Sequence, residues 1–175
     1  NSFVQATYDA CVTLGGSGIL VVASAGNSGA YNAEEPARYG SISMGFQRLD
    51  NVVSVAATTI NDTLASFSNY GEEYTHLGAP GQSILSTTPR IINEAMEAYG
   101  FGGLAPNYDI LSGTSQAAPH VSGAAALAMA LNPDITAADI HRRLASPRSV
   151  EPTLAGLTES GGRLNLYKFL QSINP

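Results

Sequence analysis

The segment 115–131 constrains the fold of this chain more than any other, because it is the longest predicted helix and it has no polar face. It is apolar almost all round and rich in alanine, and a helix of this kind is usually buried. Its small side chains, including Gly123, let neighbouring elements approach it closely. Pro119 falls in the first or second turn, where a missing N–H matters least. We therefore expect a core built around this helix.

Two continuous apolar runs, 19–23 and 52–57, contain β-branched residues and are typical of strands buried on both faces of a parallel sheet. Shorter strands are predicted at 84–87 and 108–111. Further helices are predicted at 3–14, at 137–144 after the capping residue Thr136, and at 164–173. The alternation of strands and helices predicts an α/β fold, with a mainly parallel sheet flanked by helices. No repeat or linker divides the 175 residues, so one domain is expected.

The composition argues against several kinds of partner. The net charge is -6 and no block of basic residues is present, so we expect neither a nucleic acid nor an anionic membrane as a partner. No apolar run approaches the roughly 20 residues that a membrane-spanning helix needs. The single cysteine, Cys11, excludes an internal disulfide and argues against a structural zinc site. We expect it to pack in the core.

Ser115 stands where a strand leads through a glycine turn into the long apolar helix. The start of a helix presents unpaired N–H groups and a partial positive charge, which favour an alkoxide and any oxyanion formed on attack. Gln116 and the alanines after it leave little bulk around the hydroxyl. This setting indicates a nucleophile. The alternative is that Ser115 or Thr114 only caps the helix.

Asn27 follows the predicted strand 19–23 in a glycine-flanked loop. Sheets of α/β proteins place their ligands at the carboxyl ends of the strands. The Asn27 amide can therefore donate to the oxyanion of a tetrahedral intermediate, with the backbone N–H of Ser115 as a second donor. The alternative is an asparagine that merely tolerates a turn.

Four segments of the chain resemble the subtilisin-like serine peptidases, or subtilases. Residues 113–123, GTSQAAPHVSG, resemble the catalytic-serine signature of that family, which is far more specific than an isolated Gly-x-Ser. Residues 21–27, VVASAGN, resemble the family segment that ends in the oxyanion-hole asparagine. Residues 65–71, ASFSNYG, and 79–81, APG, resemble further family segments and occur in the right order. The resemblance extends over nearly the whole chain, to about residue 170.

The resemblance implies a subtilisin-like three-layer fold and a serine endopeptidase that hydrolyses peptide bonds through an acyl-enzyme. Ser115 would be the nucleophile and Asn27 the oxyanion donor, in agreement with the chemistry of the residues themselves. It also implies a polypeptide substrate, a secreted or extracytoplasmic location, and no cofactor for catalysis. Structural calcium, which subtilases often bind, is compatible with this acidic chain. No loop shows the oxygen-ligand spacing that would assign a calcium site.

The resemblance also places a pocket for the substrate side chain that precedes the cut bond, between the backbone around 24–26 and the loop 30–35. We hypothesise that a carboxylate of Glu34 or Glu35 at the pocket floor favours cleavage after Lys or Arg. The alternative is that both carboxylates face water. The residues assigned to substrate binding are Ser24, Ala25, Gly26, Glu34, Glu35 and Thr114.

None of the three histidines is expected to act as the base for Ser115. His120 lies five residues further along the same predicted helix, which puts the two side chains about 140° apart with about 7.5 Å of axial rise. A nucleophile and its base must come within about 2.6–3.2 Å, so we expect His120 to pack in the core instead. His141 is expected to be solvated. His76 lacks the His-Gly-Thr-His-type context from which the family draws its base.

The early Asp-(Ser/Thr)-Gly-type segment that carries the family's triad aspartate is absent as well. We therefore expect residues 1–175 to be the C-terminal portion of a catalytic domain, with the triad histidine and aspartate on a separate N-terminal half. A half-sheet would leave an apolar edge open for that half. The alternatives are a catalytically inactive, peptide-binding subtilase-like protein and an isolated fragment. The stretches 40–49 and 89–107 are longer than in compact subtilases and have no assigned role.

Overall fold

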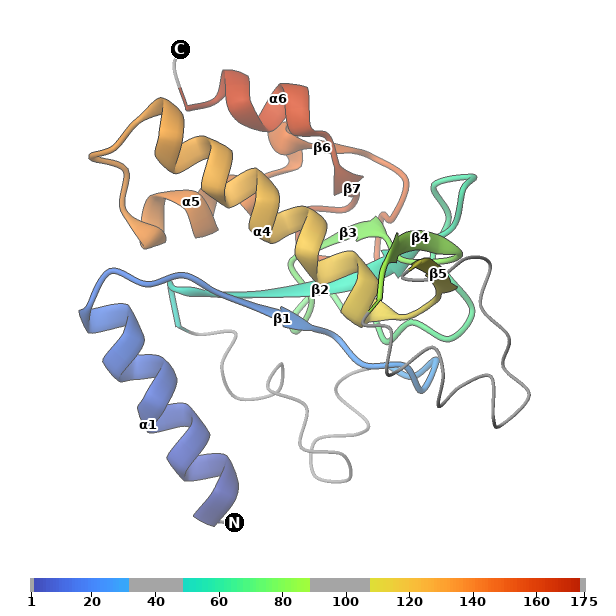
Figure 1. Ribbon diagram of the computed structural model, residues 1–175, viewed down its shortest axis with the longest axis horizontal. Coiled ribbons are helices and arrows are strands. Elements are labelled where there is room, and N and C mark those ends of the chain that lie inside the picture. Colours follow the sequence, from blue (N-terminus) through green and yellow to red (C-terminus); the bar gives the residue numbers. More distant parts are fainter. Residues whose placement is uncertain (1, 32–48, 89–107, 174–175) are drawn as a thin grey trace.

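The computed structural model describes residues 2–31, 49–88 and 108–173 (Figure 1). Its main sheet has five strands in the order β1-β2-β3-β7-β6. The strands are β1 (Val21–Ser24), β2 (Val52–Thr58), β3 (Leu77–Pro80), β6 (Val150–Glu151) and β7 (Arg163–Leu164). All neighbouring pairs are parallel except β6 with β7. The predicted α/β fold, with a mainly parallel sheet flanked by helices, is confirmed.

Strand β2 lies inside the sheet because its residues can be buried on both faces. All seven of its residues are buried, and most are valine or alanine. Strand β1 pairs with the first part of β2, with Val21 opposite Val52, and β3 pairs with the last part, with Leu77 opposite Val55. The two continuous apolar runs of the sequence thus form parallel strands, as predicted, and these strands are adjacent. Burial on both faces is confirmed for β2, but β1 is only partly buried, so that expectation is wrong for the run 19–23.

Helix α4 (Thr114–Leu131) packs across β1, β2 and β3 (Figure 1). Alanine dominates its buried side, so its backbone can approach the sheet closely. The buried residues of the helix are Thr114, Ala117, Val121, Ala124, Ala125 and Ala128. Phe169 of α6 (Leu166–Gln171) and Leu144 of α5 (Ala137–Leu144) complete the same core. The helix predicted at 115–131 therefore organises the core as expected.

The outer side of α4 is not buried, which corrects the expectation that the whole helix would be. Leu127, Met129 and Leu131 are 47%, 38% and 50% exposed. Strand β1 is an edge of the sheet in the described part of the chain, and Ile19 just before it is 48% exposed. No described element covers these side chains. The outer face of α4 and the free edge of β1 are therefore both apolar and exposed in the described part of the chain.

Helix α1 (Ser2–Gly16) and helix α4 lie on opposite sides of β1 and β2 (Figure 1). Cys11 is 3% exposed and packs beside Val52, which confirms its predicted burial. Asn51 ties this helix to the sheet, because its Nδ2 donates to the carbonyl oxygens of Cys11 (3.0 Å) and Ile19 (3.2 Å). The predicted helix at 3–14 is therefore confirmed, and the structure extends it by a residue or two at each end.

The remaining predicted elements are present, but the last helix is shorter at both ends than the predicted 164–173. Strands β4 (Ile84–Thr87) and β5 (Tyr108–Leu111) form a separate antiparallel pair. Thr136 caps α5 by accepting from the N–H of Asp139, as predicted. Helix α6 begins later than residue 164, because the residues before it pair in β7 and Asn165 forms its cap. The stretch 89–107 and most of 40–49 lie outside the described residues.

His76 and His141, called the histidine pair below, meet at the amino ends of the strands. His76 precedes β3 and is 2% exposed. Its Nδ1 accepts from the backbone N–H of Ser54 (2.8 Å), and its Nε2 lies 3.1 Å from Nε2 of His141. His141 is therefore half-buried against a second imidazole, and the prediction that it is solvated is wrong. Burial lowers the pKa of His141 and, with the second ring adding to the effect, lowers the pKa of His76 to about 3.

Candidate active site

The candidate site lies where the loop after β1 meets the start of α4. The chain leaves β1 through Ala25, whose N–H donates to a carbonyl oxygen of β2 (3.0 Å), and reaches Asn27 two residues later. It enters α4 through Gly113, whose N–H donates to the carbonyl oxygen of Gly81 (2.8 Å). Thr114 follows directly. Asn27 and Thr114, which these two loops bring together, are 87 residues apart in the sequence. They meet at the carboxyl ends of the parallel strands, where α/β proteins place their ligands.

Gly81 makes this meeting sterically feasible. A Cβ at this position would lie 2.6 Å from the Cβ of Ala57 and 2.8 Å from the carbonyl oxygen of Gly113. Both contacts are far too short, so only a glycine lets the two backbones approach. The segment 79–81, noted in the sequence for its resemblance alone, thus sets the entry of α4 into the site.

The side-chain amide of Asn27 is held in one orientation by Thr114. Its Oδ1 accepts from the backbone N–H of Thr114 (2.9 Å) and from the Thr114 hydroxyl (2.9 Å). The same hydroxyl oxygen accepts from the N–H of Gly26 (3.2 Å). Because both donors go to Oδ1, the Nδ2 of this exposed asparagine points the other way, and it has no acceptor among the described residues.

Ser115 is exposed in the first turn of α4. The helix has Gly113 at its N-cap and no side-chain cap, so the alternative in which Ser115 or Thr114 only caps the helix is wrong. The backbone N–H of Ser115 has no acceptor among the described residues, as is usual in a first helical turn. The helix dipole adds a partial positive charge beside the hydroxyl.

Two donors without an acceptor among the described residues, the Nδ2 of Asn27 and the backbone N–H of Ser115, lie close together and are called the donor pair below. The position that a Cβ on Gly113 would occupy lies 3.4 Å from the former nitrogen, 3.7 Å from the latter and 2.8 Å from Oε1 of Gln116. A side chain at Gly113 would therefore crowd both donors and the Gln116 amide. Two N–H groups placed this way can together stabilise a negative charge that develops between them.

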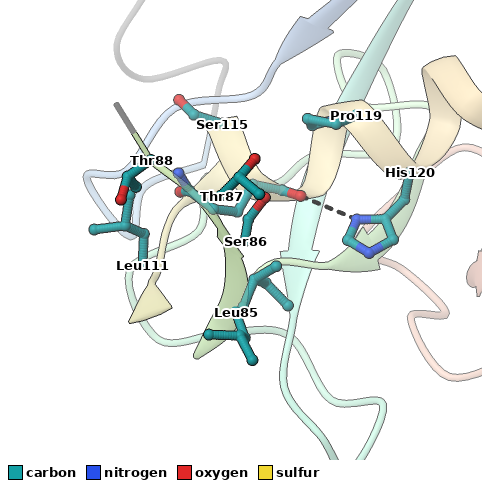
Figure 2. Close-up of a pocket in the computed structure, with 10 residues that line it drawn as sticks. Leu85, Ser86, Thr87, Thr88, Leu111, Ser115, Pro119 and His120 are labelled. Atoms are coloured by element: carbon teal, nitrogen blue, oxygen red, sulfur yellow. Dashed lines mark hydrogen bonds between the residues drawn. The ribbon is translucent and has the colours of Figure 1, made fainter. Parts of the chain in front are cut away.

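Ser115 also lines a hollow of about 390 Å³ between the first turns of α4 and strand β4. Figure 2 shows His120 on the same wall, more than one turn further along the helix, with its ring lying apart from Ser115. The Nδ1 of His120 is 3.0 Å from the carbonyl oxygen of Gln116, so this nitrogen donates to the helix itself. His120 is exposed, which corrects the prediction that it packs in the core.

No described histidine or carboxylate other than His120 lies with Ser115 in this hollow. The histidine pair belongs to the amino ends of the strands, and the site lies at their carboxyl ends. The structure thus brings Ser115 and Asn27 together as the sequence predicted. In the described part of the chain it places no imidazole in reach of the Ser115 hydroxyl as a base.

The residues assigned to substrate binding fall into three groups. Thr114 is fully buried behind Asn27, where its side chain holds the amide. Ala25 is also fully buried, whereas Ser24 and Gly26 are half-buried beside it. Glu34 and Glu35 lie outside the described residues, so the basic preference stays a prediction.

Asn69 is a site residue that the sequence did not reveal. Its buried side chain accepts from the N–H groups of Ser28 (2.8 Å) and Ala30 (3.2 Å), on the loop that carries Asn27. The segment 65–71 was noted for its resemblance, but nothing in it assigned a role to this asparagine. The contact spans about forty residues of sequence, which no local pattern records.

Among the described residues, no group of three or more histidine, cysteine, aspartate or glutamate side chains could hold a metal ion. Structural calcium stays a prediction without assigned ligands. Within the same part of the chain, no helix has both the length and the apolar character needed to cross a membrane.

Comparison with known proteins gives one consistent family. The family model described as "Subtilase family" matches residues 1–154. The chain is 38% identical over 130 residues to subtilisin DY of Bacillus licheniformis, which covers 74% of this chain and 39% of that protein. It is 37% identical over 150 residues to M-protease of Shouchella clausii, which covers 86% of this chain and 30% of that protein. The chain therefore spans well under half the length of these relatives.

Solved structures show the same fold. A lanthipeptide protease superposes with a TM-score of 0.73 at 24% identity, covering 98% of this chain and 56% of that one. The self-cleaved protease domain of PatA superposes with a TM-score of 0.66 at 26% identity, covering 95% of this chain and 54% of that one.

Proposed function

The chain belongs to the subtilase family, and from that premise we propose that it forms part of a serine endopeptidase with Ser115 as its nucleophile. The observation that carries the proposal is the donor pair. Two N–H groups without acceptors in the described structure lie close together at the start of α4, where Ser115 stands, and the Thr114 contacts to Asn27 hold one of them in place.

The reaction follows from this geometry. The Oγ of Ser115 attacks the carbonyl carbon of a peptide bond and gives its proton to a base, while the carbonyl electron pair moves onto oxygen. Asn27 Nδ2 and the Ser115 N–H stabilise that oxyanion. Its collapse breaks the C–N bond, and the amine leaves with the proton from the base. Water then hydrolyses the acyl-enzyme by the same route and restores the hydroxyl.

We propose that the base and its orienting carboxylate come from a segment outside the described residues. His120 donates to the Gln116 carbonyl, and the histidine pair lies at the other end of the sheet. Ser115 would otherwise lack the proton acceptor that a neutral hydroxyl needs. The relatives are longer than this chain, which is compatible with a further segment carrying both residues.

The open side of the molecule supports such a segment. A hollow of about 380 Å³ runs between the edge strand β1 and helix α4. Its apolar lining consists of Ile19, Leu20 and Val22 on the β1 side and of Ala125, Ala126 and Met129 on α4. Exposed apolar side chains that line a hollow are found at interaction sites, and an open strand edge can pair with another strand. We expect the segment that supplies the base to add a strand beside β1 and to cover the outer face of α4.

The substrate of the proposed enzyme is a polypeptide. A preference for Lys or Arg before the cut bond depends on Glu34 and Glu35 and stays a prediction, which cleavage of a peptide library would check. Secretion out of the cytoplasm also stays a prediction from the family.

Replacing Ser115 by alanine tests the proposed function. In the natural peptidase that contains this chain, we expect S115A to lower kcat by about a millionfold, a magnitude known for loss of the nucleophile in a subtilisin and not obtained from this structure. Because Ser115 is exposed, its stability should change by less than about 0.5 kcal/mol. Hydrolysis of a fluorogenic peptide and thermal unfolding measure the two effects.

Ser17 provides the matched control, because it is an exposed serine at the end of α1, far from the site. S17A should retain full activity. Peptide hydrolysis that survives in S115A would overturn the proposal, and a wild-type protein that binds peptides without cleaving them would favour the inactive, peptide-binding alternative.

A further inference from the structure

Asn69 makes contacts on both sides of the proposed oxyanion donor. Its side chain accepts from the N–H groups of Ser28 (2.8 Å) and Ala30 (3.2 Å), which follow Asn27 in the loop. Its own backbone N–H donates to the carbonyl oxygen of Gly26 (2.9 Å), which precedes Asn27. Asn69 thus binds the backbone both before and after Asn27, the residue whose side-chain amide belongs to the donor pair.

The Asn69 side chain also packs tightly against the loop. It is 4% exposed, and a Cβ at Gly26 would lie only 2.5 Å from its Nδ2. Gly26 has φ +109°, a conformation that L side chains rarely adopt, so the loop turns sharply at the point where the Asn69 amide rests on it. A shorter side chain at position 69 would leave a gap beside Gly26 and two partly buried N–H groups without this acceptor.

Other contacts hold the loop less directly. Gly29 donates to the carbonyl oxygen of Phe67 (2.7 Å), and Tyr70 donates to that of Ala30 (3.1 Å), so the loop lies along the segment 67–70. These are backbone bonds, which any sequence could make. Thr114 holds the Asn27 side chain from the opposite side. Among the described residues, Thr114 and Asn69 are the two side chains that hold the loop 26–30.

We propose that Asn69 is a positioning residue, which fixes the loop backbone so that the Nδ2 of Asn27 meets the oxyanion. The proposal rests on the proposed function of Asn27 as an oxyanion donor. Asn69 is buried behind the loop and touches no reacting atom, so it acts through Asn27. Loss of the clamp would move the donor, and small displacements of a catalytic group weaken the transition state more than the bound substrate.

The first test is steady-state kinetics of N69A in the natural peptidase. We expect kcat to fall by between about 10-fold and about 100-fold, the range that a small misplacement of a catalytic group produces, with KM changed less than about twofold. In an N27A background the same substitution should change kcat by less than about twofold, because the donor it positions is gone. A loss of kcat as large in the N27A background as in the wild type would overturn the proposal.

Asn51 is a matched control, since it is 3% exposed and its side chain also makes two hydrogen bonds to backbone, at the other end of the sheet. N51A should lower the thermal stability but leave kcat within about twofold, since it lies away from the site. An equal fall of kcat in N51A and N69A would mean that Asn69 acts only through general stability, and it would contradict a positioning role.

A second readout does not depend on activity. The N–H of Thr114 donates to Asn27 Oδ1, so its hydrogen exchange reports how well Asn27 is held. We expect exchange of this amide to accelerate at least about tenfold in N69A while amides of β2 stay protected. N69D keeps an oxygen at the accepting position and should retain the protection. Unchanged exchange at Thr114 in N69A would refute the positioning role of Asn69, whatever the activity of N27A. A fully active N27A, by contrast, would refute only the assignment of Asn27 as an oxyanion donor.

Discussion

The two ends of the parallel sheet carry polar groups that are used in opposite ways. At the carboxyl ends, Asn27 is exposed, and its Oδ1 is bound by Thr114 while its Nδ2 has no acceptor in the described structure. At the amino ends, His76 is buried and both of its ring nitrogens have partners. One end therefore keeps an exposed donor for a ligand, whereas both ring nitrogens of His76 at the other end are used within the protein.

The histidine pair forms a directed chain of hydrogen bonds. Nδ1 of His76 accepts from the N–H of Ser54, so the proton of a neutral ring must sit on Nε2. That N–H then donates to Nε2 of His141 (3.1 Å). A metal ion would need the lone pair of Nε2, which this tautomer does not offer. The pair is thus suited to joining α5 to the sheet and not to binding a ligand.

The comparison shows that a shifted pKa is a poor guide to the site in this chain. Shifted pKa values often gather at functional sites, yet His76, whose pKa is lowered to about 3 mainly by burial, belongs to the structural end. The proposed active site is marked instead by hydrogen-bond donors that lack partners. What distinguishes the proposed site among the described residues is that its unpaired donor, the Asn27 amide, is exposed, whereas the unpaired Ser54 hydroxyl at the amino ends is buried.

After the loss of Ser115 itself, the largest expected effect at either end is the loss of the Asn27 amide. N27A should lower kcat by about 10²–10³-fold, or about 2.7–4 kcal/mol of transition-state stabilisation, a range measured on the corresponding donor of a subtilisin and not obtained from this structure. The stability should fall by about 1–3 kcal/mol, because two hydrogen bonds are lost and the donors of the fully buried Thr114 are left without this acceptor. Peptide hydrolysis and denaturant unfolding measure both quantities.

N61A serves as its control, since Asn61 is an exposed asparagine in the loop after β2. It should retain wild-type kcat. A kcat for N27A within about twofold of wild type would show that Asn27 does not stabilise the oxyanion. The contrast drawn between the two ends of the sheet would then no longer hold.

A smaller effect, confined to stability, is expected at the amino ends. A histidine with a lower pKa in the folded than in the unfolded protein binds fewer protons when folded, so acid favours unfolding. Between pH 6.5 and about 3, His76 should lower the free energy of unfolding by up to about 1.4 kcal/mol per pH unit. The lowered pKa of His141 acts in the same direction.

Neighbouring charges modify this dependence. Glu159 lies 3.7 Å from His76 Nε2, and burial raises the pKa of its carboxyl, which acts in the opposite direction because the folded state then binds the extra proton. Asp50 faces His141 and raises the pKa of that ring. A comparison between variants, and not the absolute pH profile, therefore isolates the histidine.

H76N is the variant that isolates it. The asparagine oxygen can accept from Ser54 as Nδ1 does, but it does not titrate. H76N should flatten the fall in unfolding free energy between pH 6.5 and about 3, as measured by denaturant unfolding at a series of pH values, and leave kcat at neutral pH unchanged. An unaltered pH slope in H76N would show that the buried imidazole is not what makes the fold sensitive to acid.

Local patterns predicted the elements that have a strong period or a recognisable cap. The apolar run of β2, the alanine-rich α4 and the Thr136 cap of α5 are all present. The two-residue strands β6 and β7 were missed because they are too short to show a period. The open face of α4 was missed because its sequence records only that it is apolar, and not which element covers it.

The site was predictable in part for the same reason. Ser115 and Asn27 sit in distinctive local sequences, and the structure brings them together. The role of Asn69, the burial of Thr114 and the contact between His76 and His141 depend on pairs that lie tens of residues apart. Such contacts are set by the packing of α4 and α5 on the sheet and by the pairing of the loops that follow β1 and β2, so the sequence alone could not reveal them.

The most direct test of the account is fluorophosphonate labelling of the native protein, read by mass spectrometry of the peptide that carries Ser115. The reagent reacts with a serine whose hydroxyl is activated by a base and whose oxyanion site is formed. We predict a covalent mass increase on Ser115 that disappears when the protein is unfolded before labelling. A folded protein in its natural assembly that takes up no label on Ser115, or takes it up on another serine, would contradict the account.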